Sequence, residues 1–282
     1  MTKVLITGSS GFIGKHLIQI MCSDKFDVVA VDSSWGDVSE QTTWNSFPLV
    51  DIVIHLAGKS FVPASWEDPS LFFKSNVLGT IEALNYCKKN NASLVFLSSY
   101  MYGNPEFLPI SETAKLEASN PYALSKMLAE EACRFYAKSH SINITVLRPF
   151  NVYGTGQPPD FLIPSIISQI KNSDCIFVND LEPKRDYIHI DDLVFAIITA
   201  MQSLKGYNVY NIGSGTSYSV AELIDILQEL ASTSLPVVSS MQRRKDEIMD
   251  TIANISLANE ELRWNPKTNL KVGLKELLSF YQ

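Results

Sequence analysis

The segment Thr7–Gly14 constrains the fold more than any other part of the sequence. It carries three glycines in the spacing G-x-x-G-x-x-G, between an apolar run at residues 3–7 and a helix-period segment that begins at Phe12. Glycine lets the backbone approach an anionic group, and the free N–H groups of a helix N-terminus favour negative charge. This order of elements predicts a pyrophosphate cradle; a plain turn that happens to hold three glycines is the alternative.

Apolar runs of strand length alternate with helix-period segments over the first two thirds of the chain. The expected strands cover residues 3–7, 28–31, 52–57, 93–98 and 144–148, and the expected helices cover residues 12–22, 71–89 and 121–138. The strands lack in-and-out alternation, which is typical of parallel strands covered on both faces. We therefore predict an α/β fold with a doubly wound parallel sheet of the Rossmann type, in which a third strand near residues 36–38 is very short or missing.

The alternation of strands and helices breaks at Gly154. A loop rich in Gly, Gln and Pro follows, and later helices are expected at residues 163–171, 219–230 and 270–280. We assign residues 1–154 and 184–216 to a dinucleotide-binding Rossmann domain, and residues 155–183 and 217–282 to a second, smaller α/β domain. This second domain is expected to close over the carboxyl edge of the sheet, where ligands bind in such folds.

The composition limits which kinds of partner the protein can bind and in which compartment we expect it. The 282-residue chain carries a net charge of −7, which excludes a general attraction to nucleic acid or to anionic membranes. No apolar run approaches the roughly 20 residues of a membrane span, and the polar Gly8-Ser9-Ser10 interrupts any signal-peptide core. The four cysteines are widely spaced, as in reduced thiols. We expect a cytoplasmic protein with no nucleic-acid or membrane partner.

Two acidic residues follow the second expected strand. Asp32 ends that strand 24 residues after Gly8, where a carboxylate can bind the adenosine ribose hydroxyls of a dinucleotide. A carboxylate repels a 2′-phosphate, and neither Ser33 nor Ser34 could neutralise one, so NAD(H) is favoured and NADP(H) stays open. Asp37 is either an adenine contact or a solvated loop acid.

A second reactive group lies at the start of the helix over residues 121–138. Asn120 suits the N-cap and Pro121 the first helical position, which puts Tyr122 in the first turn and Lys126 on the same face. A nearby ammonium favours the phenolate form of a phenol, so this Y-x-x-x-K pair can exchange protons near neutral pH. Ser98 follows a buried strand and could bind a substrate oxygen, or simply end the strand.

Taken together, these elements resemble the extended short-chain dehydrogenase/reductase family, in its nucleotide-sugar epimerase/dehydratase branch. The likeness extends over nearly the whole chain, and it is similar in detail to the GDP-4-keto-6-deoxymannose reductases around residues 57–66 and 156–164. Its motifs stand at residues 7–14, 32, 55–58, 76–80, 98–103, 122–126, 148–154, 185–192 and 210–213.

The resemblance implies roles for the residues at matching positions. Tyr122 is the catalytic acid/base, Lys126 holds the nicotinamide ribose and lowers the pKa of the tyrosine, and Ser98 binds the sugar oxygen. Ser98 is preferred over Ser99 because it stands four residues before Tyr102. Beside Tyr122 and Lys126, the implied cofactor contacts are Gly8, Gly11, Phe12, Ile13, Gly14, Asp32, Asp37, Val38, Leu56, Ala57 and Gly58.

The resemblance also implies a substrate side and a mode of association. A nucleoside-diphosphate sugar is the expected substrate, and a homodimer is expected through a four-helix bundle of the helices at residues 71–89 and 121–138. Asn76 resembles a structural asparagine of the family. No metal site is expected, because the Asp191-Asp192 pair beside His189 is better explained as a helix cap. The implied substrate contacts are Ser98, Ser99, Tyr100, Asn151, Arg185, Arg243 and Asp246, with Arg244 an alternative to Arg243.

The residues after the fourth strand separate the reactions of this family. Tyr100 and Ser99 stand where 4,6-dehydratases carry a glutamate and an aspartate, and a cysteine typical of the 3,5-epimerising reductases is also missing. The expected activity is NAD(P)H-dependent reduction at C4 of a 4-keto-6-deoxy nucleoside-diphosphate sugar. The alternatives are an NAD-dependent nucleotide-sugar 4-epimerase and a non-catalytic redox sensor or scaffold.

Overall fold

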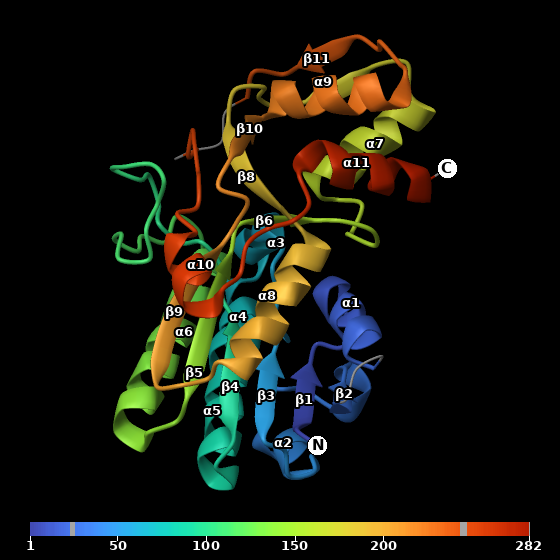
Figure 1. Ribbon diagram of the computed structural model, residues 1–282. Coiled ribbons are helices and arrows are strands. Elements are labelled where there is room, and N and C mark those ends of the chain that lie inside the picture. The colour runs from blue at the N-terminus through green and yellow to red at the C-terminus, as the bar shows by residue number, and fades with distance from the viewer. Residues whose placement is uncertain (23–25, 243–246, 282) are drawn as a thin grey trace.

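A six-stranded sheet, parallel throughout, forms the centre of the molecule (Figure 1). We describe it from a computed structural model that covers residues 1–22, 26–242 and 247–281. The strand order β2-β1-β3-β4-β5-β9 reverses direction at β1, as in doubly wound folds. The strands are β1 (Lys3–Thr7), β2 (Asp27–Val31), β3 (Ile52–His55), β4 (Ser93–Leu97), β5 (Ile144–Pro149) and β9 (Tyr207–Ile212).

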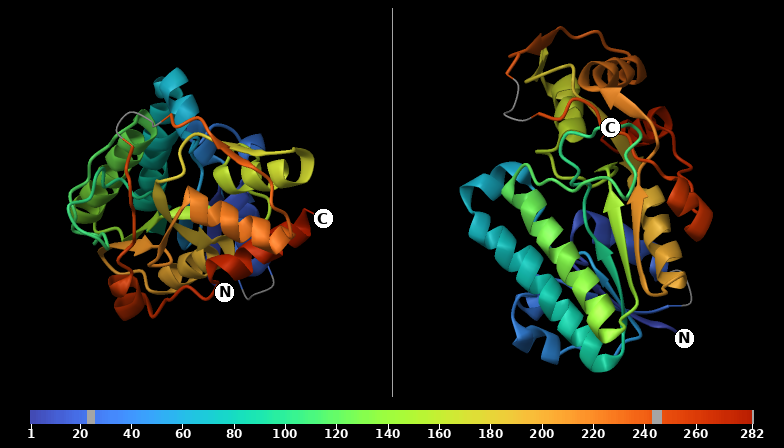
Figure 2. Two further views of the ribbon diagram at one scale, coloured as in Figure 1. Left: turned by 90° about the horizontal axis from the view of Figure 1, so that it is seen from above. Right: turned by 90° about the vertical axis from the view of Figure 1, so that its left-hand side faces the viewer.

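Helices cover both faces of this sheet, which explains the uninterrupted apolar runs. In β1, Val4 and Ile6 pack on one face, against α1 (Phe12–Met21) and α8 (Ile190–Gln202), whereas Leu5 packs on the other. That second face is covered by α2 (Gln41–Asn45), α5 (Gly79–Asn90) and α6 (Pro121–His140). Figure 2 shows α5 and α6 lying side by side along one flank. The predicted parallel Rossmann sheet is confirmed.

The connection between β2 and β3 contains no strand among its residues. It consists of a short 3-10 helix, η1 (Ser33–Trp35), followed by α2, whose Trp44 packs into the core. The expectation that a third strand near residues 36–38 is very short or missing is therefore confirmed. Twenty residues between two parallel strands leave no room for a full helix and another strand.

The helix expected over residues 71–89 is present as one uninterrupted helical segment over residues 69–90, which contains a π-helical turn. After α3 (Val62–Glu67), the chain forms α4 (Pro69–Phe72), a π-helical turn η2 (Phe73–Leu78) and then α5. Such turns insert one residue into a helix and are frequent at functional sites. The turn contains Asn76, whose buried side chain forms hydrogen bonds to Lys59 and to Ser125 of α6.

A second apolar core lies above the carboxyl edge of the large sheet. It is built on the sheets β10-β8-β6 and β11-β7, covered by α7 (Leu162–Asn172), α9 (Val220–Ala231) and α11 (Leu270–Phe280) (Figure 2). The short strands are β6 (Asn151–Tyr153), β7 (Ile176–Val178), β8 (Lys184–His189), β10 (Ser217–Ser219) and β11 (Val237–Ser239).

The chain crosses between the two cores more often than expected. The helix α10 (Ser256–Leu262) and Trp264 pack on the large-sheet core with α8, although both lie in the range assigned to the smaller domain. The strand β8, assigned to the Rossmann domain, belongs instead to a small sheet with β6 and β10. The two-domain division remains a prediction. No described helix has the length and apolarity needed to cross a membrane.

Candidate active site

The glycine-rich turn links β1 to α1 at the carboxyl edge of the sheet. Gly8 adopts φ = 71°, and a Cβ there would lie 2.8 Å from the backbone nitrogen of Ala57. A Cβ at Gly14 would overlap the carbonyl oxygen of Gly8. Gly11 is the N-cap of α1, and no side chain caps the helix there. These features fit a pyrophosphate, because an anion could take the place of the missing cap.

Asp32 stands at the end of β2 as the N-cap of η1. Its Oδ1 accepts hydrogen bonds from the backbone nitrogen (2.9 Å) and the hydroxyl (2.6 Å) of Ser34. These hydrogen bonds hold the pKa of the Asp32 carboxyl below its usual value. The carboxylate is therefore charged and fixed in direction, as ribose binding requires.

Asp37 and Val38, expected beside the adenine, have partners of their own. Asp37 accepts hydrogen bonds from the backbone and side chain of Ser39 and pairs with Lys74 at 3.1 Å. Val38 packs against the α5 side of the core, and a Cβ at Gly79 would lie 3.1 Å from it. The structure explains both residues by local packing, so an adenine contact remains a prediction.

Leu56, Ala57 and Gly58 continue from β3 along the same edge. Leu56 is partly buried in the core, and the backbone nitrogen of Ala57 lies 3.2 Å from the hydroxyl of Thr7. A Cβ at Gly58 would lie 2.7 Å from Oδ1 of Asn76 and 3.7 Å from Nζ of Lys126. The segment thus passes close to the Lys126 ammonium, where a side chain would interfere.

Asn76 joins the turn η2 to α6 and to the segment after Gly58. Its Oδ1 accepts from the backbone nitrogen of Lys59 (2.8 Å), and its Nδ2 donates to the Lys59 carbonyl (3.0 Å) and to the Ser125 hydroxyl (2.8 Å). Ser125 is the neighbour of Lys126. The side chain of Asn76 therefore holds the segment after Gly58 and the first turns of α6 in fixed positions.

Tyr122 and Lys126 lie on one face of α6, whose N-cap is Asn120 as expected. Burial raises the pKa of the Tyr122 phenol, and a hydrogen bond to the Ser99 side chain partly lowers it. Burial lowers the pKa of Lys126 to about 8. Its Nζ donates to the carbonyl oxygen of Leu97 at 2.7 Å.

The two serines after β4 point in different directions, and this differs from the sequence prediction. Ser98 is 3% exposed, and its hydroxyl donates to Oε2 of Glu130 at 3.0 Å. Ser99 is partly exposed, and its side chain reaches Tyr122. Counting four residues back from Tyr102 selects Ser98. In the structure the Glu130 carboxylate binds the Ser98 hydroxyl, and it is the Ser99 side chain that acts on the Tyr122 phenol.

Tyr100 and Asn151 form one wall of the expected substrate side. The Tyr100 hydroxyl donates to Oδ1 of Asn151 at 3.0 Å, and its ring stacks on Phe150 at 4.8 Å. Asn151 also donates to the carbonyl oxygen of Asp186 at 3.0 Å. The neighbouring hydroxyl of Tyr187 is buried without a hydrogen-bond partner. This wall offers phenol and amide groups in place of the carboxylate of a dehydratase.

Arg185, expected at the substrate diphosphate, is engaged within the protein. Its guanidinium pairs with the carboxylate of Glu247 and donates to the carbonyl oxygens of Ile248 (2.7 Å) and Lys184 (2.8 Å). Arg243 and Asp246 lie outside the described residues. A diphosphate contact by Arg185 remains a prediction.

His189 and its acidic neighbours form the one group of potential metal ligands in the described residues. Ligand atoms of His189, Asp191 and Glu276 lie within 4.8 Å of one another. The His189 ring accepts from the backbone nitrogen of Asp191, whereas Asp192 accepts from the backbone nitrogens of Lys267 and Thr268 at 2.9 Å. The helix cap is therefore His189 rather than the aspartate pair. The expectation of no metal stays a prediction.

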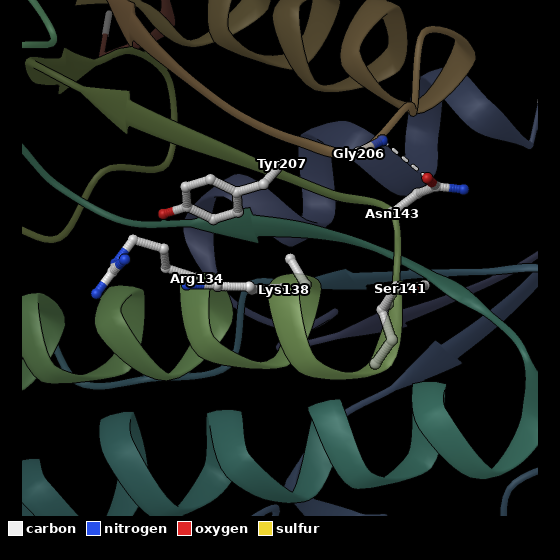
Figure 3. A pocket seen from close by; sticks show the side chains of 8 residues that line it. Arg134, Lys138, Ser141, Asn143, Gly206 and Tyr207 are labelled. Atoms are coloured by element: carbon white, nitrogen blue, oxygen red, sulfur yellow. Dashed lines mark hydrogen bonds between the residues drawn. The ribbon is translucent and has the colours of Figure 1, made fainter.

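One surface pocket lies far from this edge. It is lined by Arg134, Lys138, Asn143, Gly206 and Tyr207 around the C-terminal end of α6 and the start of β5 (Figure 3). Parallel strands carry their functional residues at the opposite, carboxyl edge. We therefore do not include this pocket in the site.

Glu130 is the main residue of this region that the motifs did not indicate. It follows Lys126 by four residues, as Lys126 follows Tyr122, so helical periodicity alone could have pointed to it. Glu130 is 4% exposed, and its carboxylate forms an ion pair with the Arg148 guanidinium.

The fold and the site together define a nicotinamide-dinucleotide-dependent enzyme of the short-chain dehydrogenase/reductase type. The sequence model of the NAD dependent epimerase/dehydratase family matches residues 4–213, and the chain belongs to that family. Its cofactor is accordingly NAD(H) or NADP(H).

Similar proteins include both reductases and epimerases. GDP-6-deoxy-D-mannose reductase of Pseudomonas aeruginosa is 30% identical over 303 residues, covering 99% of this chain and 97% of that protein. The structure of RMD from Pseudomonas aeruginosa complexed with NADPH superposes with a TM-score of 0.93 at 29% identity, covering 100% and 99% of the two chains. UDP-glucose 4-epimerase of Thermus thermophilus in complex with NAD gives 0.90 at 25% identity, covering 99% and 98%. The chain is thus similar to enzymes that modify nucleotide sugars.

Proposed function

We propose that the protein reduces the C4 carbonyl of a 4-keto-6-deoxy nucleoside-diphosphate sugar with NAD(P)H. The observation that carries this proposal is the placement of Tyr122 and the buried Lys126 on one face of α6, with the Ser99 side chain acting on the Tyr122 phenol. The full-length similarity to GDP-6-deoxy-D-mannose reductase supports the substrate class.

The side chains divide the work of carbonyl reduction. When bound, the reduced nicotinamide supplies a hydride to the sugar C4. Tyr122 donates its phenolic proton to O4 as the carbonyl becomes an alcohol, and the Ser99 hydroxyl stabilises the charge that develops on that oxygen. Lys126 holds the cofactor ribose and favours the phenolate left on Tyr122.

The protonated form of Tyr122 suits the acid that carbonyl reduction requires. Burial raises the pKa of this phenol, so it is protonated at neutral pH and ready to act as an acid. The first step of a 4-epimerase requires the opposite, a phenolate that removes the C4 hydroxyl proton. The wall formed by Tyr100 and Asn151 carries no carboxylate that could remove a C5 proton, which argues against dehydration.

A nucleotide-sugar 4-epimerase is the second candidate. The carboxylate of Asp32 favours NAD(H) over NADP(H), and the similar Thermus thermophilus epimerase is described in complex with NAD. In this reading Tyr122 first accepts and then returns the proton on O4, with no net consumption of cofactor.

Turnover assays distinguish the two candidates. With GDP-4-keto-6-deoxymannose, the reductase consumes NAD(P)H in a one-to-one ratio, which is followed by its absorbance. Interconversion of C4 epimers by enzyme that retains bound NAD would support the epimerase instead. Binding without turnover of any nucleotide sugar would favour a non-catalytic sensor or scaffold.

The variant Tyr122→Phe tests the acid. We expect turnover to fall by at least about 100-fold while NADH binding stays within about threefold, because only the proton donor is removed. Unchanged turnover would exclude Tyr122 from the mechanism.

We also propose that the protein is a cytoplasmic homodimer. An apolar strip, formed by Leu124, Leu128 and Phe135 of α6 with Leu71 and Leu78 beside it, is exposed along the α5–α6 flank. Such contiguous apolar surface marks an interface. The four cysteines are free thiols, as in a reducing compartment.

A further inference from the structure

Glu130 lies one helical turn beyond Lys126 and two turns beyond Tyr122, on the face of α6 that meets the sheet. Both of its carboxylate oxygens are engaged. Oε1 pairs with Nη2 of Arg148, and Oε2 accepts from Nε of Arg148 (3.1 Å) and from the Ser98 hydroxyl (3.0 Å). A buried carboxylate held at both oxygens has one orientation.

Arg148 is fixed in turn by groups from other segments. Its Nη1 donates to the Tyr102 hydroxyl at 2.8 Å and to the carbonyl oxygen of Glu112 at 3.0 Å. Tyr102 donates to Oδ1 of Asn211 in β9 at 2.5 Å. The ion pair is therefore part of a buried network that spans β5, β9 and the loop after β4, and it does not depend on solvent-exposed side chains.

Hydrogen bonds hold the Leu97–Ser98 peptide unit and the Ser98 side chain, which directly precede Ser99. The Leu97 carbonyl accepts from Lys126, the Ser98 nitrogen donates to the Leu147 carbonyl at 2.8 Å, and the Ser98 hydroxyl donates to Glu130. Three successive groups of the chain are thus bound. The direction of Ser99, and with it the contact to Tyr122, follows from these bonds.

The Glu130 carboxylate is also the acidic group that acts on Lys126. Burial lowers the pKa of Lys126 to about 8, and Cys133 and Glu130 of the same helix oppose that effect. From the sheet, the Phe96 ring lies 4.9 Å from Nζ, and the ring of His55 is uncharged near neutral pH because burial lowers its pKa to about 3. A thiol near neutral pH carries no charge, so Glu130 supplies the negative charge.

We propose that Glu130 is a positioning residue of the active site: it orients Ser99 toward Tyr122 through Ser98, and it keeps the Lys126 ammonium charged at neutral pH. This inference rests on the proposed use of Tyr122 and Lys126 in the reaction. It assigns a function to a buried ion pair, a kind of contact that often adds little net stability because both charges lose their hydration.

The charge effect is tested by the affinity for NADH as a function of pH. In the wild type, fluorescence titration should show weakening as pH rises through about 8, because Lys126 loses its proton. In Glu130→Gln the same transition should move down by at least about half a pH unit. The exposed Glu131→Gln, which removes an equal charge from the same helix, should leave the transition in place. An unchanged transition in a folded Glu130→Gln would overturn the proposal.

Two further variants keep the test decisive. If Glu130→Gln does not fold because Arg148 is left unpaired, the double variant Glu130→Gln/Arg148→Met takes its place in the NADH titration. Ser98→Ala keeps the ion pair and removes the tether: we expect about tenfold lower turnover with an unshifted NADH transition. Unchanged turnover of Ser98→Ala would contradict the orienting role. The NADH titration needs no sugar, so it remains valid even if every nucleotide sugar fails as a substrate.

Discussion

The carboxylate of Asp32 accepts two hydrogen bonds from Ser34 on a single oxygen, Oδ1, at 2.9 Å from the backbone nitrogen and 2.6 Å from the hydroxyl. This pair turns the chain at the end of β2 and holds the carboxylate beside the glycine-rich turn, where the Ser9 nitrogen donates to the Val31 carbonyl oxygen. The same local motif that ends the strand thereby orients the group expected to select the cofactor.

Replacing Asp32 should change the cofactor preference. We expect Asp32→Asn to lower NADH affinity about tenfold, because a charged hydrogen bond to the ribose is lost. The double variant Asp32→Ala/Ser33→Arg should favour NADPH, since a guanidinium suits the 2′-phosphate. Isothermal titration with both cofactors measures the ratio, with Glu40→Gln as a surface control. A wild type that already prefers NADPH would contradict the assignment.

The two serines after β4 should respond differently to truncation. We expect Ser99→Ala to lower turnover by about 100-fold or more, because it removes a donor to the developing oxyanion. Ser98→Ala should cost only about tenfold, through orientation. Steady-state kinetics of the two variants side by side measures the difference. A larger loss in Ser98→Ala would restore the role that the sequence motif indicates.

His55 should make the fold sensitive to acid. Burial lowers its pKa from 6.5 to about 3, so between these values the unfolded chain binds a proton that the native protein does not. Its contribution is complete above pH 6.5 and falls on acidification by up to about 1.4 kcal/mol per pH unit. Urea denaturation of the wild type and His55→Gln at pH 7.5 and 5.0 measures the difference. Equal pH dependence in the two proteins would disprove this effect.

A charge on the exposed flank of α6 should prevent dimer formation. Leu128 is 42% exposed and Phe135 is 59% exposed in the isolated chain. We expect Leu128→Glu or Phe135→Glu to give a monomer, because a buried unpaired carboxylate is unfavourable in an interface. Light scattering after size exclusion reports the mass, and Phe177→Glu, on the small β11-β7 sheet, serves as the matched control. A monomeric wild type would refute the proposed bundle.

Much of the fold could be predicted because its signals are local. The run Lys3–Thr7, the turn to Gly14 and the helix from Phe12 are specified by neighbouring residues, and the structure places them within one or two positions. The small strands β6, β8 and β10 were not predicted. Each is only three to six residues long and is stabilised by partners distant in the sequence.

The active site shows the same division at the level of single residues. Sequence alone determined the kinds of group present and their order: a glycine turn, an acid after the second strand, and a tyrosine and lysine on one helical face. Tertiary structure decided which of the two serines acts on Tyr122. It also decided that the Arg185 guanidinium forms an ion pair with Glu247. The physical reason is that a side chain at the end of a strand takes its direction from what binds the backbone before it. Here those bonds come from Lys126, Leu147 and Glu130, which lie 29 or more residues further along the chain than the groups they hold.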